Sequence, residues 1–386
     1  MDRRDFLKTT VLLAVPGLLL EGCAHFNFSE PSSSGDVLLL PMVGSLGIYR
    51  PKIDELRFIA VPNVNTHSVV PNPARPREVL VLDQVETHAS LVDIAQERLL
   101  ATCSPVDGFV FSGHGCISAD GRYLFLCENH KDNQSPSVKK KIPGHITVRD
   151  ASSLQVLRTI PAHGAWAHNV MFMRGESILA VGYQATEGAA NEPKRGAEML
   201  FLSASEGAIL ERFVPPDTHW SLNHFDFTHD DKIIVAAQTT YVDGAKASGD
   251  LVIKDLVAPV LMGKPGQKNW TQNMPPSLAS SMIRNHTVFV DRERRRALVA
   301  HQLGGHVSVW DTDKEQLISA LEIDNPQGIC ATLDGRYYVV VNKEKTIIFL
   351  EAETLKISRR IDGRNMSRAG LDGPQHIAMI KGGASV

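Results

Sequence analysis

The chain has 386 residues, of which 43% are hydrophobic and 22% are charged, and its formal net charge at pH 7 is −3. This composition is typical of a folded globular protein and excludes disorder, collagen and coiled coil as the main state. Because 40 Lys and Arg residues nearly balance 43 Asp and Glu residues, the chain has no overall positive field to hold a nucleic acid backbone. We therefore expect no nucleic acid partner.

The first 23 residues are typical of an export signal. Arg3 and Arg4 form a twin-arginine pair, and a short apolar run follows at residues 9–20. Pro16 and Gly17 interrupt this run, which is shorter than the about 20 apolar residues that a membrane-spanning helix needs. We predict export by the twin-arginine pathway and a periplasmic location. Since this pathway carries folded proteins, a cofactor loaded before export is compatible with it.

Cys23 follows the apolar run in a sequence similar to a lipoprotein cleavage site, although Glu21 stands where a small or uncharged residue is usual. Lipidation of Cys23 would anchor the mature protein to the membrane, with the serine-rich residues 24–35 as a flexible linker. The alternative is cleavage by an ordinary signal peptidase, which would give a soluble periplasmic protein.

Residues 36–386 have the pattern of an all-β domain. Short alternating or β-branched runs are separated by turn residues, and no helical stripe exceeds about two turns. An inner hairpin turns at Asp120-Gly121 and recurs with turns at 334–335, 174–175, 230–231 and 292–293. An outer hairpin pairs 146–150 with 156–160, and its first strand recurs at 307–311, 347–351 and 79–83. Each repeat thus supplies four strands, the unit of a propeller blade.

Histidine occupies six of seven equivalent positions, each six residues before the first residue of an inner turn. The seven positions, 42 to 62 residues apart, are His67, His114, His168, His224, His286, Gly328 and His376. This spacing fits four-stranded blades with variable loops and predicts a seven-bladed β-propeller. A strand at 376–380 has no hairpin after it, and strands near 37–42 and 56–61 have no inner strand. We expect the C-terminal strand to join the N-terminal strands and close the ring.

Four cysteines remain after the signal: Cys103, Cys116, Cys127 and Cys330. No CxxC or CxxCH pair occurs, which argues against zinc ribbons, thioredoxin-like sites and c-type haem attachment. Cys116 and Cys127 are expected on adjacent strands. An oxidising compartment is compatible either with a disulfide between them or with buried free thiols.

Three histidine-containing segments, 113–129, 163–168 and 219–224, resemble the domain-of-unknown-function family 1513, and the resemblance covers most of the chain after about residue 60. It implies twin-arginine export and a seven-bladed propeller, and it implies no reaction. The inner hairpins are also similar to generic propeller repeats of the YVTN and WD40 types. Members of the family are often found beside periplasmic iron-acquisition components, which favours iron by association.

The six recurring histidines form the candidate site. The first strand of each propeller blade lines the central channel, so we expect these residues to converge at one mouth of it. Neutral imidazole binds Fe, Cu, Zn and Ni. We therefore predict that this ring binds either a transition metal ion (Fe, Cu or Zn) or an anionic ligand. Alternatively, the imidazoles only fill a polar channel and bond to backbone carbonyls and water.

Three further residues are candidates for orienting the ring histidines. His163 and His219 each lie five residues before a ring histidine, and Glu128 ends the second strand of its blade. The alternatives are a structural hydrogen-bonding role for the two histidines and a solvated loop position for Glu128.

Two functions follow from these features. The first is a periplasmic propeller that binds a metal ion or small ligand through its histidine-lined channel, with a link to iron handling. The second is a non-catalytic platform that docks a partner protein of the cell envelope. The sequence contains no GxSxG elbow, HExxH motif, Walker loop or dinucleotide fingerprint, and we assign no catalytic residue and do not decide whether the protein is an enzyme.

The export signal gives the first prediction. Replacing Arg3 and Arg4 with lysine should leave the precursor in the cytoplasm, as measured by cell fractionation. Cys23→Ala should move the mature protein from the membrane fraction to the soluble periplasmic fraction. A Cys23→Ala protein that stays in the membrane fraction would contradict the lipid anchor.

Overall fold

The structure, a computed structural model, describes residues 35–63, 65–134, 142–184, 197–217, 219–239, 256–363 and 374–381. The chain divides into two units, residues 1–30 and 31–386, and the described residues all belong to the second. The predicted signal, Cys23 and nearly all of the predicted linker lie outside the described residues. No helix in the described part is both long and apolar enough to cross a membrane.

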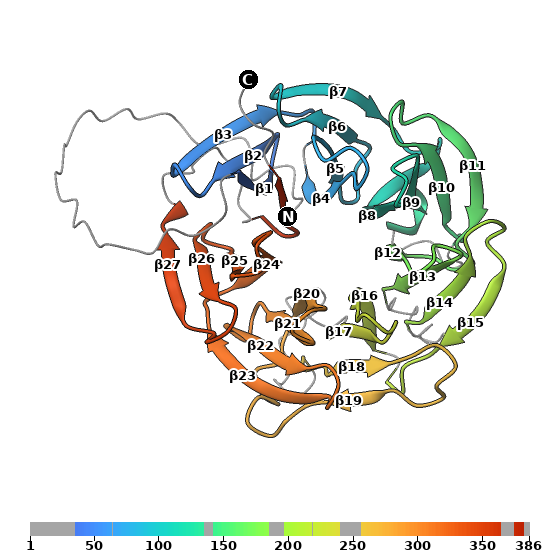
Figure 1. Ribbon diagram of the computed structural model, residues 1–386. Helices are drawn as coiled ribbons and strands as arrows, with labels where there is room; N and C mark the ends of the chain where they lie inside the picture. The colour runs from blue at the N-terminus through green and yellow to red at the C-terminus, as the bar shows by residue number, and fades with distance from the viewer. Residues whose placement is uncertain are drawn as a thin grey trace, which may run out of the picture. The chain divides into compact units, whose positions relative to one another are not determined.

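Seven four-stranded antiparallel sheets in the described residues form a ring of blades (Figure 1), which confirms the predicted seven-bladed propeller. Six blades consist of consecutive strands: β4 (Thr66–Pro71), β5 (Glu78–Asp83), β6 (Ala89–Asp93) and β7 (Arg98–Cys103); β8 (Phe109–Ile117), β9 (Tyr123–His130), β10 (His145–Asp150) and β11 (Val156–Pro161); β12 (Ala167–Phe172), β13 (Ile178–Tyr183), β14 (Met199–Ser203) and β15 (Ile209–Phe213); β16 (Trp220–Phe227), β17 (Ile233–Thr239), β18 (Val260–Gly263) and β19 (Thr271–Asn273); β20 (Asn285–Asp291), β21 (Arg296–His301), β22 (His306–Asp311) and β23 (Gln316–Glu322); β24 (Pro326–Ala331), β25 (Tyr337–Asn342), β26 (Ile347–Glu351) and β27 (Ile357–Ile361). A single turn of 3-10 helix, η1 (Lys131–Gln134), follows β9.

The seventh blade combines the two ends of the domain. It contains β28 (Ala378–Lys381), β1 (Asp36–Met42), β2 (Ser45–Arg50) and β3 (Glu55–Ala60) in that order. β28 pairs with β1 from Asp36↔Lys381 to Leu39↔Ala378. The predicted closure by the C-terminal strand is therefore confirmed, with the strand two residues shorter at its start than the predicted 376–380.

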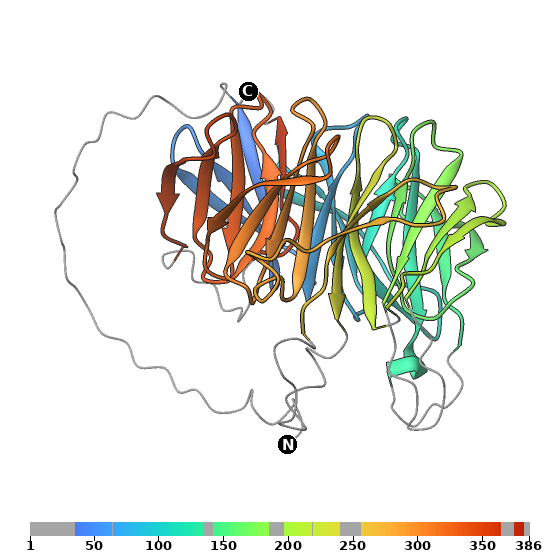
Figure 2. The same ribbon diagram turned by 90° about the horizontal axis from the view of Figure 1, so that it is seen from below.

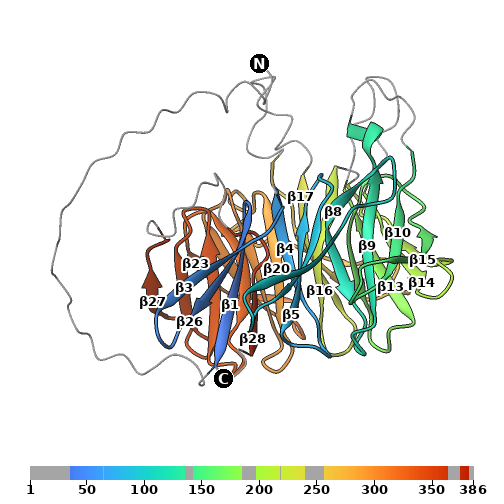
Figure 3. The ribbon, with the colours of Figure 1, turned by 90° about the horizontal axis from the view of Figure 1, so that it is seen from above.

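The place of a strand in its blade follows from its sequence. The second strand β25 (YYVVVN) is buried along its whole length, whereas the outermost strand β23 (QLISALE) alternates between exposed and partly buried residues. Middle strands are covered on both faces, but an outermost strand presents one face to water. In the edge-on views, inner strands such as β4, β16 and β20 run along the ring axis and outer strands such as β3 cross it steeply, as sheet twist requires (Figures 2 and 3).

One strand assignment made from the sequence is wrong. The run 79–83 was predicted to be the third strand of a blade, but it is part of β5, which pairs with β4 and β6 and is the second strand. Both middle strands are buried on two faces, so a continuous apolar run fits either position equally well.

The hydrophobic core lies between neighbouring blades. Seven clusters of buried side chains in the described residues each join two adjacent blades. Ile377 and Met379 lie in the cluster on one side of the closing blade, and Ile380 lies in the cluster on the other side. The C-terminal segment thus contributes to two of the seven interfaces as well as to the β-sheet.

The cysteines are buried or partly buried thiols. Cys103, Cys116, Cys127 and Cys330 are all free, so the disulfide between Cys116 and Cys127 does not form. Cys116 lies opposite Phe125 in the β8–β9 ladder rather than opposite Cys127. Burial raises the pKa of Cys103 to about 11 and raises the pKa values of the other three thiols further, which keeps them protonated and poorly reactive at neutral pH.

The closure gives the second prediction. Deletion of residues 376–386 removes β28 and the burial of Ile377, Met379 and Ile380, each worth about 1.5–3 kcal/mol. The total is comparable to the stability of a typical domain, so the truncated protein should aggregate or lose cooperative unfolding by calorimetry. Deletion of 382–386 alone, which leaves β28 intact, is the control and should melt like the full chain. Unchanged melting of the longer deletion would contradict the closure.

Candidate metal centre

The ring histidines come from the innermost strands of the blades. His67, His114, His168, His224 and His286 lie on β4, β8, β12, β16 and β20, and each is at most 8% exposed. His376 lies two residues before β28, bridges to Ser68 and donates its backbone N–H to the His67 carbonyl oxygen over 3.3 Å. Five of the histidines are therefore buried, His376 is partly buried, and His67, His168 and His286 each lie at the second residue of an inner strand.

A break in strand pairing occurs at every ring position on an inner strand. The β4–β5 ladder shifts between Thr66 and Ser68, so His67 has no opposite residue, and the β12–β13 ladder shifts in the same way at His168. Equivalent shifts lie at or beside the other three inner-strand histidines. A β-bulge turns the side chain of the extra residue away from the normal alternation. The bulges can thus direct the imidazoles toward the axis.

Two glycines set how closely the ring can pack. Gly113 has a φ of +97°, and a Cβ there would lie 2.7 Å from Cδ2 of His67. At Gly328, the ring position without histidine, a Cβ would lie 2.9 Å from the Ile377 side chain. The segment that carries His376 fills that space. Ring closure therefore explains why the sixth of the seven positions is glycine.

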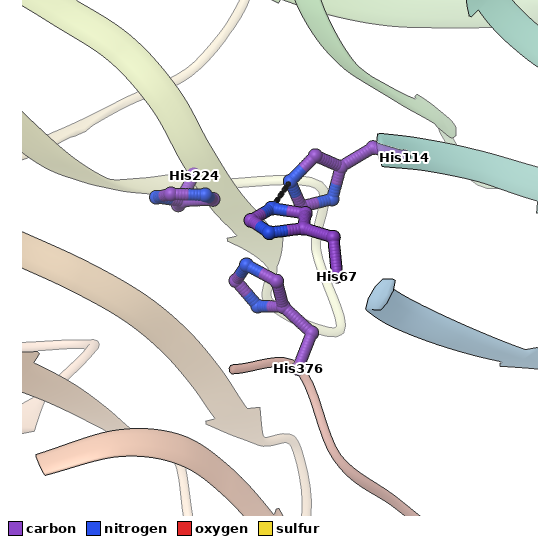
Figure 4. A group of neighbouring side chains, drawn as sticks. All are labelled: His67, His114, His224 and His376. Atoms are coloured by element: carbon purple, nitrogen blue, oxygen red, sulfur yellow. Dashed lines mark hydrogen bonds between the residues drawn. The ribbon is translucent and has the colours of Figure 1, made fainter. Parts of the chain in front are cut away.

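The six imidazoles form one cluster. Twelve pairs of these rings have centroids 4.7 to 6.5 Å apart. Four of them, His67, His114, His224 and His376, each offer one nitrogen within 4.8 Å of the other three (Figure 4). His168 adjoins this quartet, because its Nε2 lies 3.3 Å from Nε2 of His224.

Two nitrogens of the quartet are buried without a hydrogen-bond partner in the described part of the chain. They are Nε2 of His376 and Nδ1 of His224. Nδ1 of His376 is 3.4 Å from Oγ1 of Thr287, which is also 3.3 Å from Nδ1 of His286. Nε2 of His67 and Nε2 of His114 are 2.9 Å apart, a distance that suits one N–H donor and one lone pair.

Burial lowers the pKa values of all six histidines. It is the largest cause in each case, and the other ring histidines lower most of them further, since two imidazolium ions at this distance would repel each other. The pKa of His168 falls to about 3, and that of His286 to about 4, with the charge of Arg284 as a second cause. At neutral pH the ring is therefore uncharged and its nitrogens are free to bind a metal ion.

The three candidate orienting residues have hydrogen-bond or ion-pair partners outside the ring of histidines. His163 contacts the Gly207 carbonyl oxygen through Nε2 over 2.7 Å, and His219 pairs with Asp217 over 2.8 Å. These contacts favour the structural alternative for both histidines.

Glu128 is fully buried, so the predicted alternative of a solvated loop position is wrong. Its carboxylate accepts hydrogen bonds from Thr147 and Arg149 at 2.7 and 2.9 Å and lies 3.0 Å from Nε2 of His145. Burial raises the pKa of Glu128, but these hydrogen bonds outweigh it and hold the pKa below its ordinary value. Glu128 thus belongs to a polar network within its own blade.

Sequence reasoning missed the residues that support His286. Asn285 donates to the carbonyl oxygens of Ala237 and Ala258 at 2.8 Å, and its Oδ1 lies 2.6 Å from Nδ1 of His301. His301 continues the chain to Ser308, which accepts a hydrogen bond from the Trp310 indole. This network fixes the backbone next to His286. Nothing in the spacing of these residues in the sequence marks the network. Thr287, whose hydroxyl contacts His286 and His376, could have been noticed because it directly follows a ring histidine.

Comparison with known proteins identifies the family. The model of the family described as "Protein of unknown function (DUF1513)" matches residues 59–379. The chain belongs to this family. No curated protein matches. The match covers six of the blades completely and includes all six ring histidines.

Solved structures show the same fold at low sequence identity. Hydrazine synthase of Kuenenia stuttgartiensis has a TM-score of 0.60 at 13% identity, over 81% of this chain and 90% of that chain. The periplasmic gluconolactonase of Pseudomonas aeruginosa has a TM-score of 0.60 at 12% identity, over 90% of this chain and 99% of that chain. These likenesses support the propeller fold of this family member and nothing beyond it.

The buried imidazoles give the third prediction. Histidines of the unfolded chain titrate near about 6.5, so below this pH the unfolded state binds more protons and the stability of the metal-free protein should fall. For His168 the difference reaches about 2 kcal/mol near about pH 5. The free energy of unfolding should therefore fall between about pH 7 and about pH 5 in both proteins, but by about 2 kcal/mol less in His168→Gln than in the wild type. Urea unfolding with a chelator present measures this difference. The control is His219→Gln, outside the cluster. Equal pH dependence of wild type and His168→Gln would contradict the assignment.

Proposed function

We propose that this protein is an exported propeller that binds a transition metal ion through the histidines of its central channel. The observation that carries the proposal is the quartet of His67, His114, His224 and His376, with two buried nitrogens that lack a partner in the described residues. A buried polar atom without a partner is costly, and a metal ion would satisfy both.

The dimensions of the quartet fit a metal ion. Metal–nitrogen bonds of about 2.0–2.1 Å in a tetrahedral site place the ligand nitrogens about 3.4 Å apart. The nitrogens of the quartet lie within 4.8 Å of one another, and Nε2 of His67 and Nε2 of His114 are 2.9 Å apart. Small rotations of the rings would bring four nitrogens to one ion, with His168 and His286 beside it.

The donor atoms limit which metal ions the site can bind. Imidazole nitrogen suits Zn, Cu, Fe and Ni, whereas Mg and Ca prefer oxygen ligands. Neutral imidazole is the form that binds, and the lowered pKa values keep the ring in that form. A link to iron handling is the more specific form of the proposal, and it rests only on the family resemblance.

Export, anchoring and partners are proposed on the sequence alone. We infer that the twin-arginine pair sends the folded protein to the periplasm, where Cys23 anchors it to the membrane. Metal loading before export would agree with the transport of a folded protein. Docking of an envelope protein on the propeller is the second proposed role, and it does not exclude metal binding. No reaction is part of the proposal, since the structural likenesses at 12–13% identity concern the fold alone.

The fourth prediction tests the metal site. Protein matured through its own export route should contain metal in a fixed ratio near one ion per chain by elemental analysis, and Fe, Cu, Zn or Ni should raise the melting temperature of the metal-free form. The double variant His114→Ala/His224→Ala should lose the metal, because two of the four ligands are gone, while it still folds.

His163→Ala is the matched control, because His163 lies outside the cluster, and its metal content should equal that of the wild type. Wild-type protein without stoichiometric metal and without stabilisation by any of the four ions would overturn the proposal.

A further inference from the structure

One ligand of the quartet lies on a different kind of segment from the other three. His67, His114 and His224 lie on β4, β8 and β16, each of which a short turn joins to the second strand of its blade. His376 belongs to residues 374–381, the closing segment, which contains β28 and pairs with β1 from the opposite end of the domain. No turn joins β28 to β1, so non-covalent contacts hold the closing segment in its blade.

His376 completes the quartet (Figure 4). Its ring centroid lies 4.7, 4.7 and 4.8 Å from those of His67, His114 and His224, whereas the centroids of His67 and His224 are 6.5 Å apart. The other three histidines are buried, but His376 is partly buried. The quartet thus comes nearest to solvent at His376, and withdrawal of this residue would remove one ligand and uncover the other three.

The ladder that holds the closing segment is short. β28 has four residues, whereas the other innermost strands have six to nine. Its further contacts are the hydrogen bond from the His376 N–H to the His67 carbonyl oxygen and the packing of Ile377, Met379 and Ile380. Elements with few buried contacts open locally at a lower free energy than the whole domain. We therefore expect this segment to open more readily than the other innermost strands.

Gly328 on β24 sets how tightly the closing segment fits. A Cβ at this position would lie 2.9 Å from the Ile377 side chain and 3.0 Å from the Gln375 carbonyl oxygen. One of these neighbours would have to move, because such contacts are shorter than normal packing allows. A single methyl group at position 328 would thus loosen the closing segment without a change in any histidine or in β28.

We propose that the closing segment is the gate of the metal centre: the ion enters and leaves when residues 376–381 separate from β1 and His67, and the bound ion holds the ring closed. The proposal rests on the proposed metal function and adds to it the route of metal exchange. The ion has four histidine ligands in the closed ring and three in the open one, so it favours the closed ring. By linkage, ring closure strengthens metal binding by the same factor.

The fifth prediction tests the gate with a reversible crosslink. Leu38 and Met379 are opposite each other in the β1–β28 ladder, and opposite Cα atoms of an antiparallel pair are about 4.5–5.5 Å apart, which a disulfide can span. Zn²⁺ is the probe, because it suits four imidazoles whichever metal ion the protein carries in the cell. Leu38→Cys/Met379→Cys is loaded with Zn²⁺ while reduced and then oxidised, and the transfer of Zn²⁺ to excess EDTA is followed.

Oxidation should slow the release of Zn²⁺ at least about tenfold, because the segment can no longer open locally, and renewed reduction should restore the rate. The matched control is Leu39→Cys/Ile48→Cys, which links β1 to β2 at another opposite pair of buried residues. A turn already joins these two strands, so oxidation of the control should leave the rate unchanged. The native thiols should not interfere, because burial raises their pKa values.

A second variant tests the gate in the opposite direction. Gly328→Ala should release Zn²⁺ at least about threefold faster than the wild type, because it favours the open segment. Its control is Gly164→Ala, where the new Cβ would lie 2.8 Å from the Tyr183 ring, between β11 and β12, and release should be unchanged.

The outcomes separate the gate from the metal function. Release from oxidised Leu38→Cys/Met379→Cys at the reduced rate, or release from Gly328→Ala at the wild-type rate, would overturn the gate and leave the metal function intact. Wild-type protein that retains no Zn²⁺ would overturn the metal function as well.

Discussion

The closure of the ring is the constraint on which the rest of this structure depends. β28 pairs with β1, so a segment from the end of the domain completes the blade that its beginning leaves open. The same segment brings His376 against His67 and occupies the space beside Gly328. Without that pairing the seventh blade would lack its inner strand and the ring its sixth histidine. Fold stability and site geometry therefore have one common origin.

The chemistry of the site arises from desolvation. Six imidazoles in water would titrate near about 6.5, but inside the channel burial and mutual repulsion keep them neutral. Neutral imidazoles held together by bulged strands lose hydrogen bonds to water without gaining equivalents, as the unpartnered nitrogens of His224 and His376 show within the described residues. The protein stabilises this arrangement through seven apolar interfaces between blades, and a metal ion is the partner that its donor atoms fit.

Some local predictions failed for reasons that are physical. The run 79–83 was placed in the wrong strand of its blade because both middle strands are buried on two faces. Cys116 and Cys127 were expected on adjacent strands, which is correct, but the register sets Cys116 opposite Phe125. Glu128 could be read as solvated or as an orienting residue, and it is buried against Arg149 of the next strand. Each of these depends on a register or a burial that a single sequence does not contain.

The sequence by itself determined the all-β class, the seven repeats, the closure and the identity of the six histidines, because turn residues and strand alternation are local and the repeat places equivalent residues at equivalent positions. Only the tertiary structure decided that the imidazoles are largely buried, that four of them form a quartet with His168 and His286 beside it, and that Gly113 and Gly328 make the packing feasible. Distances across the ring depend on how blades pack against one another, and packing between segments far apart in the chain is not encoded in any local pattern.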